Sequence, residues 1–457
     1  MKELTLKQIA DWCGGTVAPE YETVPVTGVE SDSRKVEVGD LFVALRGERV
    51  DGHDFIPSAK TLGASAALVS RPSEELPCVV VESPLRAYGE IAKHYREMTG
   101  VKVVGITGSV GKTTTKEMIA SVLSRDFKLY KSEGNHNNEI GLPMTVMNMP
   151  EDTELLVAEL GTNHPGEIAY LSAIAQPDYA VITNIGIAHI EYLGSREGIL
   201  REKLDILRSS LKNTVGIFNG DEPLLWNVRD KGTHKKYYFG IDNPSCDVVA
   251  SGIQELDDGM RFHVSGFHHE FELFVPALGR HMVYNALAAA TVGLAMGVKP
   301  ETIQNELSIF RNTGMRQKIY EKNGMTIIED CYNAGPESTE AALGVLASVK
   351  TSGKRIAVLG DMLELGNRSS AEHYRIGRIA AQKADLLLTY GAHSVRTVTG
   401  AITGGMSPKN AEHFDTHEDL VRMLKMRAGE ADVILFKGSR GMKMERVLQM
   451  FLDDHEK

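Results

Sequence analysis

The sequence predicts an α/β protein of three domains. The chain has 457 residues, and at about 150 residues per domain this length suggests roughly three folding units. Short runs of apolar and β-branched residues alternate with helical patterns, which is typical of parallel sheets covered by helices. We therefore predict a small N-terminal α/β domain at 1–99, a central P-loop domain with a parallel sheet at 100–313, and a Rossmann-like domain at 314–457.

The predicted strands are short and apolar. In the N-terminal domain we expect strands at 41–45, 66–69 and 79–81, and a helix at 86–98 that leads to the next domain. The central domain opens with a strand at 101–106, and its further strands are expected at 155–160, 179–185 and 215–218. The C-terminal domain repeats the alternation, with strands at 326–330, 355–360, 385–390 and 433–436. Because helical patterns separate these runs, parallel pairing is the expected arrangement.

Composition and charge exclude several classes of protein. Hydrophobic residues make up 42% of the chain and charged residues 24%, which argues against disorder, collagen-like repeats and a coiled coil. Lys and Arg total 50 and Asp and Glu total 61, so the formal net charge is −11. A chain of this charge is poorly suited to broad, salt-dependent nucleic-acid binding. An anionic ligand would have to be held by a local site.

Neither a membrane span nor a disulfide framework is expected. The longest apolar stretch, 286–298, is shorter than a span requires and predicts a buried helix. The N-terminus lacks the apolar core and cleavage site of a signal peptide. The cysteines form no Cys-x-x-Cys pair, so we expect reduced thiols, no zinc site and a cytoplasmic location; they are Cys13, Cys78, Cys246 and Cys331.

The strongest motif is Gly105-Ile106-Thr107-Gly108-Ser109-Val110-Gly111-Lys112-Thr113-Thr114-Thr115. It follows a predicted strand and precedes a helical pattern at 116–123, which is the context of a P-loop for a nucleotide triphosphate. Glycines let backbone N–H groups surround an anion, and the helix N-terminus adds a positive dipole. Lys112 would neutralise the β- and γ-phosphates, and Thr113 would offer its hydroxyl to Mg²⁺. The motif indicates ATP or GTP, but it does not indicate the reaction.

Two further polar residues follow predicted strands of the central domain. Glu159 ends the apolar run at 155–160, where a carboxylate is costly unless it is paired or bound to a metal. Glu159 is a magnesium ligand, an exposed residue at the edge of the sheet, or a partner in a structural ion pair. His189 lies just past the strand at 179–185, and the carboxyl ends of parallel strands are where α/β sites gather. His189 is a ligand, a structural histidine or a surface histidine.

Lys203 lies on a helix that we expect to begin after Ser195 and to run to about Ser209. Ile199, Lys203 and Ile206 share one face of this helix, so the lysine could be partly buried. Burial would lower its pKa and free the amine for carbamate formation or catalysis. The alternative is an exposed lysine that pairs with Glu202 or Glu197.

Taken together, these motifs resemble the Mur ligase family of ATP-dependent amide-forming enzymes. The resemblance spans all three segments and adds Ser31-Asp32-Ser33-Arg34, Gly39–Leu45, Asn135–Pro143, His281-x-x-x-Asn285-Ala286-Leu287-Ala288-Ala289 and Met315-Arg316. Within the family, the chain is most similar to the members that add D-alanyl-D-alanine. Two features carry this similarity: the loop ending Thr-Thr-Thr-Lys, and Asp330–Ser338, in which Cys331 and Gly335 depart from the usual Ser-Tyr-Asn-Ala-Asn-Pro pattern.

The resemblance implies roles for particular residues. ATP would be bound by Thr107, Gly108, Ser109, Val110, Gly111, Lys112, Thr113, Thr114, Asn285, Arg316, Asp330, Tyr332 and Asn333. Two Mg²⁺ ions would be held by Thr113, Glu159, His189 and a carbamate on Lys203. Lys112, Lys203 and His189 would be the catalytic residues. The other substrates would contact Ser31, Ser33, Arg34, Asn137, Asn138, Lys437, Ser439 and Arg440.

The implied reaction joins UDP-N-acetylmuramoyl-tripeptide and D-alanyl-D-alanine through an acyl phosphate, with release of ADP and phosphate. The implied partners are these substrates alone, without nucleic acid or membrane, and we expect a monomer. The sequence is also compatible with three other functions. The chain could be another Mur or folylpolyglutamate-type ligase with a different amino substrate, a P-loop NTPase doing conformational work, or a nucleotide-binding regulatory protein.

Overall fold

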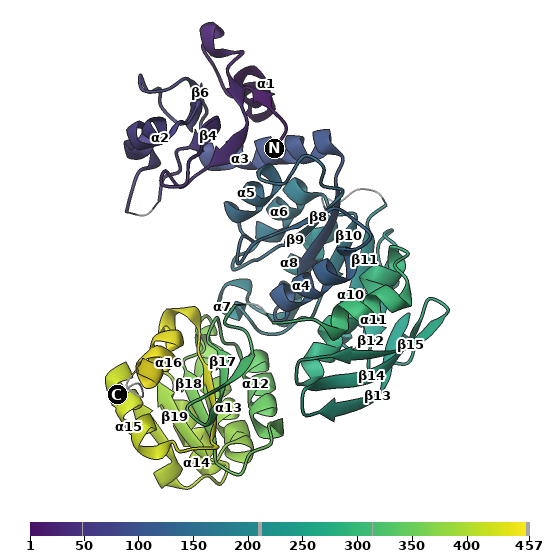
Figure 1. The fold of residues 1–457 in the computed structure, drawn as a ribbon, viewed down its shortest axis with the longest axis vertical. Coiled ribbons are helices and arrows are strands. Elements are labelled where there is room, and N and C mark those ends of the chain that lie inside the picture. Colours follow the sequence, from purple (N-terminus) through teal and green to yellow (C-terminus); the bar gives the residue numbers. More distant parts are fainter. Residues whose placement is uncertain (48, 209–212, 313, 454–457) are drawn as a thin grey trace.

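The computed structural model describes residues 1–47, 49–208, 213–312 and 314–453. Figure 1 shows three lobes that follow one another along the long axis, with the N-terminal lobe in purple at one end and the C-terminal lobe in light green to yellow at the other. Each lobe contains its own main sheet: four strands in the N-terminal lobe, nine in the middle lobe and six in the C-terminal lobe. The predicted α/β fold is therefore present in every lobe.

The N-terminal lobe is built on a parallel sheet whose strands are β3 (Gly28–Glu30), β4 (Asp40–Val43), β5 (Ala66–Val69) and β6 (Cys78–Val80), in chain order. The strands predicted at 41–45, 66–69 and 79–81 are confirmed to within two residues. The prediction missed β3 and the short pair β1 (Leu4–Thr5) and β2 (Pro25–Val26). The lobe also contains α1 (Leu6–Cys13), which a capping box at Thr5 begins, and α2 (Ile56–Leu62).

Helix α3 (Pro84–Thr99) joins the N-terminal lobe to the middle lobe and confirms the helix predicted at 86–98. The Oγ of Ser83 accepts from the backbone N–H of Arg86 at its start, and Gly100 ends it with φ of +66°. Near its end, the guanidinium of Arg96 donates to the carbonyls of Ala175 (3.2 Å) and Gln176 (3.0 Å) and to the carboxylate of Asp178 (3.2 Å). The buried Arg96 thereby fastens α3 to the middle lobe.

Replacing Arg96 by methionine should lower the free energy of unfolding by about 2 kcal/mol, because it removes a buried cation that pairs with the partly exposed carboxylate of Asp178. The two carbonyls would also lose their donor. A shift of the urea unfolding midpoint measures the effect. Lys93→Met is the matched control on the same helix, because the pair of Lys93 with Glu90 is largely exposed and should contribute little. Equal midpoints for the two variants would contradict this prediction.

The middle lobe is built on a nine-stranded sheet in the order β15-β14-β13-β12-β11-β10-β7-β9-β8. Its strands are β7 (Lys102–Thr107), β8 (Leu129–Lys131), β9 (Leu155–Glu159), β10 (Tyr179–Ile182), β11 (Val215–Asn219), β12 (Lys236–Gly240), β13 (Val248–Leu256), β14 (Gly259–Gly266) and β15 (His269–Val275). The strands predicted at 101–106, 155–160, 179–185 and 215–218 are all present and parallel. The prediction missed β8 and β12–β15, of which β13–β15 pair antiparallel.

Alternate residues of the central strands face two different layers. Val103 and Ala158 pack with α5 (Gly141–Met147), α6 (Glu167–Ala175) and α8 (Arg196–Leu204). Val104 and Val157 pack with α4 (Lys112–Leu123), α10 (Arg280–Ala295) and α11 (Pro300–Ser308) on the other face. The buried helix predicted at 286–298 is confirmed in α10, which ends at Ala295 because Met296 and Gly297 turn the chain. The short helices α7 (Ile190–Leu193) and α9 (Pro223–Trp226) complete the lobe.

The C-terminal lobe has the expected Rossmann-like arrangement. Its six strands lie in the order β16-β17-β21-β18-β19-β20, with β16 (Lys318–Lys322) antiparallel and the rest parallel: β17 (Met325–Asp330), β18 (Arg355–Gly360), β19 (Leu386–Tyr390), β20 (Ala411–Phe414) and β21 (Val433–Lys437). The four strands that we predicted here are all present. The helices are α12 (Pro336–Ser348), α13 (Ser369–Lys383), α14 (Val395–Thr403), α15 (His417–Arg427) and α16 (Met444–Asp453).

Two further expectations concern the whole chain. Within the described ranges, none of the helices combines the length and the apolar character that a membrane crossing needs. Cys13, Cys78 and Cys246 are half-buried and Cys331 is buried, and all four are free thiols, as predicted.

Candidate active site

The candidate site is a cavity of about 810 Å³ between the middle and C-terminal lobes. One wall comes from the loops that follow β7, β9 and β10, and the opposite wall comes from the loops that follow β17, β18 and β21. The predicted site residues that line it are Ser109, Val110, Gly111, Lys112, Thr113, Thr114, Asn137, Asn138, Glu159, His189, Asn285, Arg316, Asp330, Tyr332, Asn333, Lys437, Ser439 and Arg440. The fold thus brings most of the predicted nucleotide and metal residues to one place.

The glycine-rich loop has the predicted form of strand, loop and helix. Strand β7 ends at Thr107, and α4 begins at Lys112. Gly108 has φ of +151° and Gly111 has φ of +85°. A Cβ on Gly108 would lie 1.9 Å from Oγ1 of Thr183, and a Cβ on Gly111 would lie 2.7 Å from Oδ1 of Asn285. Both positions therefore need glycine for conformation and for space.

The segment after β10 supports this loop, and sequence reasoning missed it. Oδ1 of Asn184 accepts from the Val110 N–H at 3.0 Å, and Oγ1 of Thr183 donates to the Val110 carbonyl at 2.6 Å. The Gly186 N–H donates to Oγ of Ser109 at 2.9 Å. Their place in the chain could have revealed them, because they directly follow a predicted parallel strand, where α/β sites gather.

Lys112 lies folded back on the loop, with its Nζ donating to the Gly108 carbonyl at 3.0 Å. Burial lowers the pKa of Lys112, the neighbouring Arg316 lowers it further, and the carboxylate of Glu159 opposes the change. The amine is thus placed where the phosphates of a nucleotide on this loop would lie.

Glu159 is the last residue of β9 and is 2% exposed. Its Oε2 accepts from Oγ1 of Thr113 at 2.7 Å, and its Oε1 accepts from Nδ2 of Asn137 at 2.9 Å. Its two partners are uncharged, so it is not held by an ion pair of the kind considered above. A carboxylate beside a hydroxyl is an oxygen donor set that suits Mg²⁺. The described parts of the chain bring no three His, Cys, Asp or Glu side chains together as a metal-binding group.

Lys203 is buried, so the alternative prediction of an exposed lysine is wrong. Helix α8 begins at Arg196 after Ser195, whose Oγ accepts from the Gly198 N–H at 3.1 Å. Ile199, Lys203 and Ile206 are all buried, as their shared face predicts. Helix α8 ends at Leu204, earlier than expected, in a short 3-10 turn over Asp205–Leu207, and Ser209 lies outside the described residues.

Within the described residues the amine of Lys203 forms no close ion pair with Glu197 or Glu202, although the charge of Glu202 opposes the lowering of its pKa. The carboxylate of Glu202 instead accepts from the backbone N–H groups of Gly166 (2.7 Å) and Ile168 (2.8 Å). Burial holds the pKa of Lys203 well below its usual value, and the positive charge of Lys112 lowers it further. Lys203 is not among the residues lining the cavity, although its charge interacts with that of Lys112. A buried amine of this kind is available as a neutral nucleophile.

His189 lines the cavity and faces a carboxylate from the other lobe. It caps the N-terminus of α7 with φ of +59°, and its Nδ1 pairs with the carboxylate of Glu364. The contact with His189 lowers the pKa of Glu364. A second carboxylate from the C-terminal lobe, that of Glu337, accepts from the Ile187 N–H at 2.9 Å. Sequence reasoning missed both glutamates, because no local pattern reveals a contact between lobes.

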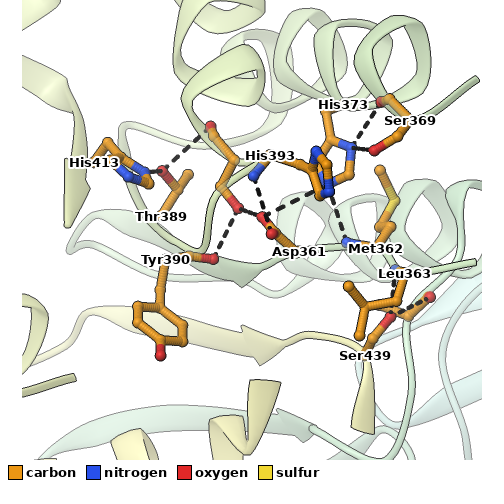
Figure 2. A network of polar contacts seen from close by, with 12 residues as sticks. Asp361, Met362, Leu363, Ser369, His373, Thr389, Tyr390, His393, His413 and Ser439 are labelled. Carbon is orange, nitrogen blue, oxygen red and sulfur yellow. Dashed lines mark hydrogen bonds and ion pairs between the residues drawn. The ribbon is translucent and has the colours of Figure 1, made fainter. Parts of the chain in front are cut away.

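The wall from the C-terminal lobe carries three cationic side chains, those of Arg316, Lys437 and Arg440. Nζ of Lys437 donates to Oδ2 of Asp330 at 2.6 Å and to the Asn333 carbonyl at 3.0 Å. The guanidinium of Arg316 lies 4.1 Å from the centre of the Tyr332 ring. Ser439 takes part in the polar network of Figure 2 and donates to the Ala334 carbonyl at 3.0 Å.

Ser31, Ser33 and Arg34 lie in the N-terminal lobe and do not line the cavity. The Arg34 side chain is 86% exposed and forms a double hydrogen bond with Asp32, at 2.8 and 2.7 Å. Asn138 lines the cavity, and its Oδ1 accepts from the Gly141 N–H at 2.9 Å. The predicted substrate residues are therefore divided between two separate regions.

Comparison with known proteins agrees with this architecture. Family models match residues 25–108 (Mur ligase family, catalytic domain), 106–293 (Mur ligase middle domain) and 315–440 (Mur ligase, glutamate ligase domain). The chain is 41% identical to a UDP-N-acetylmuramoyl-tripeptide--D-alanyl-D-alanine ligase of Bacillus subtilis, over 99% of each chain.

Two solved structures are similar over nearly their whole length. MurF from Acinetobacter baumannii has a TM-score of 0.90 and 32% identity, with 99% of each chain covered. The MurF ligase of Thermotoga maritima, in complex with ADP, has a TM-score of 0.83 and 31% identity, and the match covers 94% of this chain and 98% of that one. Given the matched domains and the full-length relatives, the chain belongs to the Mur ligase family.

Proposed function

We propose that this chain is an ATP-dependent ligase that joins D-alanyl-D-alanine to UDP-N-acetylmuramoyl-tripeptide, a step of peptidoglycan precursor synthesis. The observation on which the proposal depends is a phosphate-binding loop with a half-buried lysine, Lys112. This loop lines a cavity whose other wall belongs to a second lobe. The relative from Bacillus subtilis bears the name of this activity, and the similar MurF ligase of Thermotoga maritima was solved with ADP.

The chemistry explains why two lobes must meet. A peptide carboxylate is a poor electrophile, and its attack on the γ-phosphate of ATP produces an acyl phosphate and ADP. The amine of the dipeptide then attacks the acyl carbon, and phosphate leaves. Lys112 neutralises charge on the phosphates, and Arg316 and Lys437 supply positive charge from the facing wall. Enclosure between the lobes aligns the reactants and keeps out water that would hydrolyse the acyl phosphate.

The residues present fit a magnesium site. Thr113 and Glu159 form a buried pair of oxygen donors, and Lys203 is a buried amine without a described partner. We propose that Thr113, Glu159, His189 and a carbamate on Lys203 hold Mg²⁺, as the family resemblance implies. When bound, Mg²⁺ would neutralise phosphate charge. The carbamate is chemically reasonable because it turns an amine, which cannot supply negative charge to a metal, into an anionic oxygen donor.

The other substrate contacts follow the division between lobes. Ser31, Ser33 and Arg34 would bind the uridine-nucleotide end of the long substrate. Asn137 and Asn138 would contact the part near the phosphates, and Lys437, Ser439 and Arg440 would contact the incoming dipeptide. A monomer in the cytoplasm remains our expectation for the working enzyme.

A substrate panel scored by ADP release and by product mass tests the proposal. The ligase should form ADP only when UDP-N-acetylmuramoyl-tripeptide and D-alanyl-D-alanine are both present. A requirement for a different amino acid would indicate another ligase of the family or a folylpolyglutamate-type ligase. Substantial turnover with ATP alone would indicate an NTPase that does conformational work, and nucleotide binding without turnover would indicate a regulatory protein.

A further inference from the structure

Figure 2 shows a network of polar contacts in the C-terminal lobe, and two of its members, Leu363 and Ser439, line the cavity. Asp361 directly follows β18, is 3% exposed and accepts from the His393 N–H at 3.0 Å and from Oγ of Ser394. Its backbone carbonyl accepts from the Ser439 N–H at 3.0 Å. Asp361 thus joins the ends of three neighbouring strands, β18, β19 and β21.

His373, on α13, is 1% exposed and connects to the same segment. Its Nε2 lies 3.0 Å from the Met362 N–H, and its Nδ1 lies 2.8 Å from the Ser369 carbonyl. A backbone N–H can only donate and a carbonyl can only accept, so the ring must be neutral with its proton on Nδ1. The ring is therefore a fixed acceptor for the Met362 N–H.

The next residues of this loop reach the cavity. The Leu363 N–H donates to Oγ of Ser439 at 2.9 Å, and Glu364 then pairs with His189 of the middle lobe. Glu364 has φ of +61°, and its partner His189 has φ of +59°. Left-handed backbone is costly for residues other than glycine, and it persists where surrounding contacts determine it. Here the contacts on Met362 and Leu363 immediately precede the strained residue.

We propose that His373 is a positioning residue for the ligase reaction: by accepting from the Met362 N–H it shapes the loop at 361–365 so that Glu364 orients His189 across the lobe interface. The carboxylate of Glu364 takes the proton on Nδ1 of His189 as its hydrogen-bond partner, which leaves Nε2 free for a ligand. His189 is thus correctly oriented only while the C-terminal lobe is in place. The kinetic test of this inference rests on the proposed function, because it measures ligation.

Two amide substitutions of His373 test whether its role is to accept the hydrogen bond from the Met362 N–H or only to fill space in the fold. In His373→Gln the side-chain oxygen can reach the position of Nε2 and still accept from the Met362 N–H. In His373→Asn the shorter side chain reaches only the position of Nδ1. Glu364→Ala removes the carboxylate itself. The Glu364 side chain is half-exposed, so we expect this variant to fold normally. His413→Leu is the control, because this histidine contacts Thr389 in the same network but does not touch the loop.

We expect Glu364→Ala and His373→Asn to lower activity to a similar degree, and His373→Gln to retain it. Glu364→Ala and His373→Asn should each lower kcat/KM for D-alanyl-D-alanine by about 10- to 100-fold, the usual effect of losing such a partner. The double variant should fall no further than the single ones, because both act through Glu364. His373→Gln and His413→Leu should remain near the unmodified enzyme. Independent, multiplying effects, or equal losses for the Asn and Gln variants, would overturn the proposal.

Hydrogen exchange gives a readout that does not depend on activity. In the unmodified protein the amide of Met362 should be protected; His373→Asn should expose it, and His373→Gln should restore the protection. Unchanged exchange in His373→Asn would refute the role of His373. If His373→Asn does not fold, His373→Gln still tests the proposal, because this variant must keep both the ligation activity and the exchange protection of the Met362 amide. If the unmodified chain does not ligate, the proposed function fails, while this exchange comparison still tests the positioning of the loop.

Discussion

Lys112→Ala should lower kcat for ligation by roughly 10²- to 10³-fold, the usual effect of losing one donor that stabilises developing negative charge. Lys112 is half-buried, and its Nζ already donates to the Gly108 carbonyl of the loop, so little rearrangement is needed to reach a phosphate.

The measurement for Lys112→Ala is ADP release with both substrates at saturating concentration. Lys128→Ala serves as its matched control, because the side chain of that lysine is exposed and pairs with Asp152, which is exposed too. The control should keep full activity. Undiminished turnover in Lys112→Ala would contradict the role assigned to the lysine and, with it, the position assigned to ATP.

Lys203→Ala should be almost inactive and should regain part of its activity with a small carboxylic acid. A short carboxylate can enter the space left by the side chain and supply the oxygen donors that we assign to the carbamate. The physical basis is the environment of the amine. Burial and the charge of Lys112 hold the pKa of Lys203 well below its usual value, so the neutral amine that reacts with CO₂ is available. Carbamate formation would also place a negative charge near the cation of Lys112, which would attract it.

The rescue of Lys203→Ala is followed by ADP release against added acetate or formate. Arg201→Ala, on the exposed side of the same helix, is the control and should be unaffected with or without the acid. Full activity in Lys203→Ala without rescue would remove the carbamate from the proposal. Crystallographic density on Nζ of Lys203 is the direct test, because the group is labile in other measurements.

Local signals were sufficient for several parts of the site. The phosphate-binding loop was predictable because strand, glycines and helix start are adjacent in the chain and each has its own sequence signature. The buried face of α8 was predictable because Ile199, Lys203 and Ile206 recur at helical spacing. The apolar run at 286–298 likewise indicated the buried helix α10.

Other features were missed because their signals were weaker or not local. The strands β13–β15 carry many polar residues on one face, so they lack the continuous apolar runs that revealed the parallel strands. The roles of Glu337 and Glu364 depend on contacts with Ile187 and His189 in another lobe. Helix periodicity and strand alternation contain no information about such pairs.

The sequence by itself determined the α/β class, the strands that carry the site, the phosphate-binding loop and the set of polar residues at strand ends. The tertiary structure decided which of these residues meet. Thr113 and Glu159 are 46 residues apart, and His189 and Glu364 are 175 apart, yet each pair is in contact. The physical reason is that backbone propensity acts over a few neighbouring residues, whereas these contacts depend on β7 pairing with β9 and β10 and on how two separate lobes face each other.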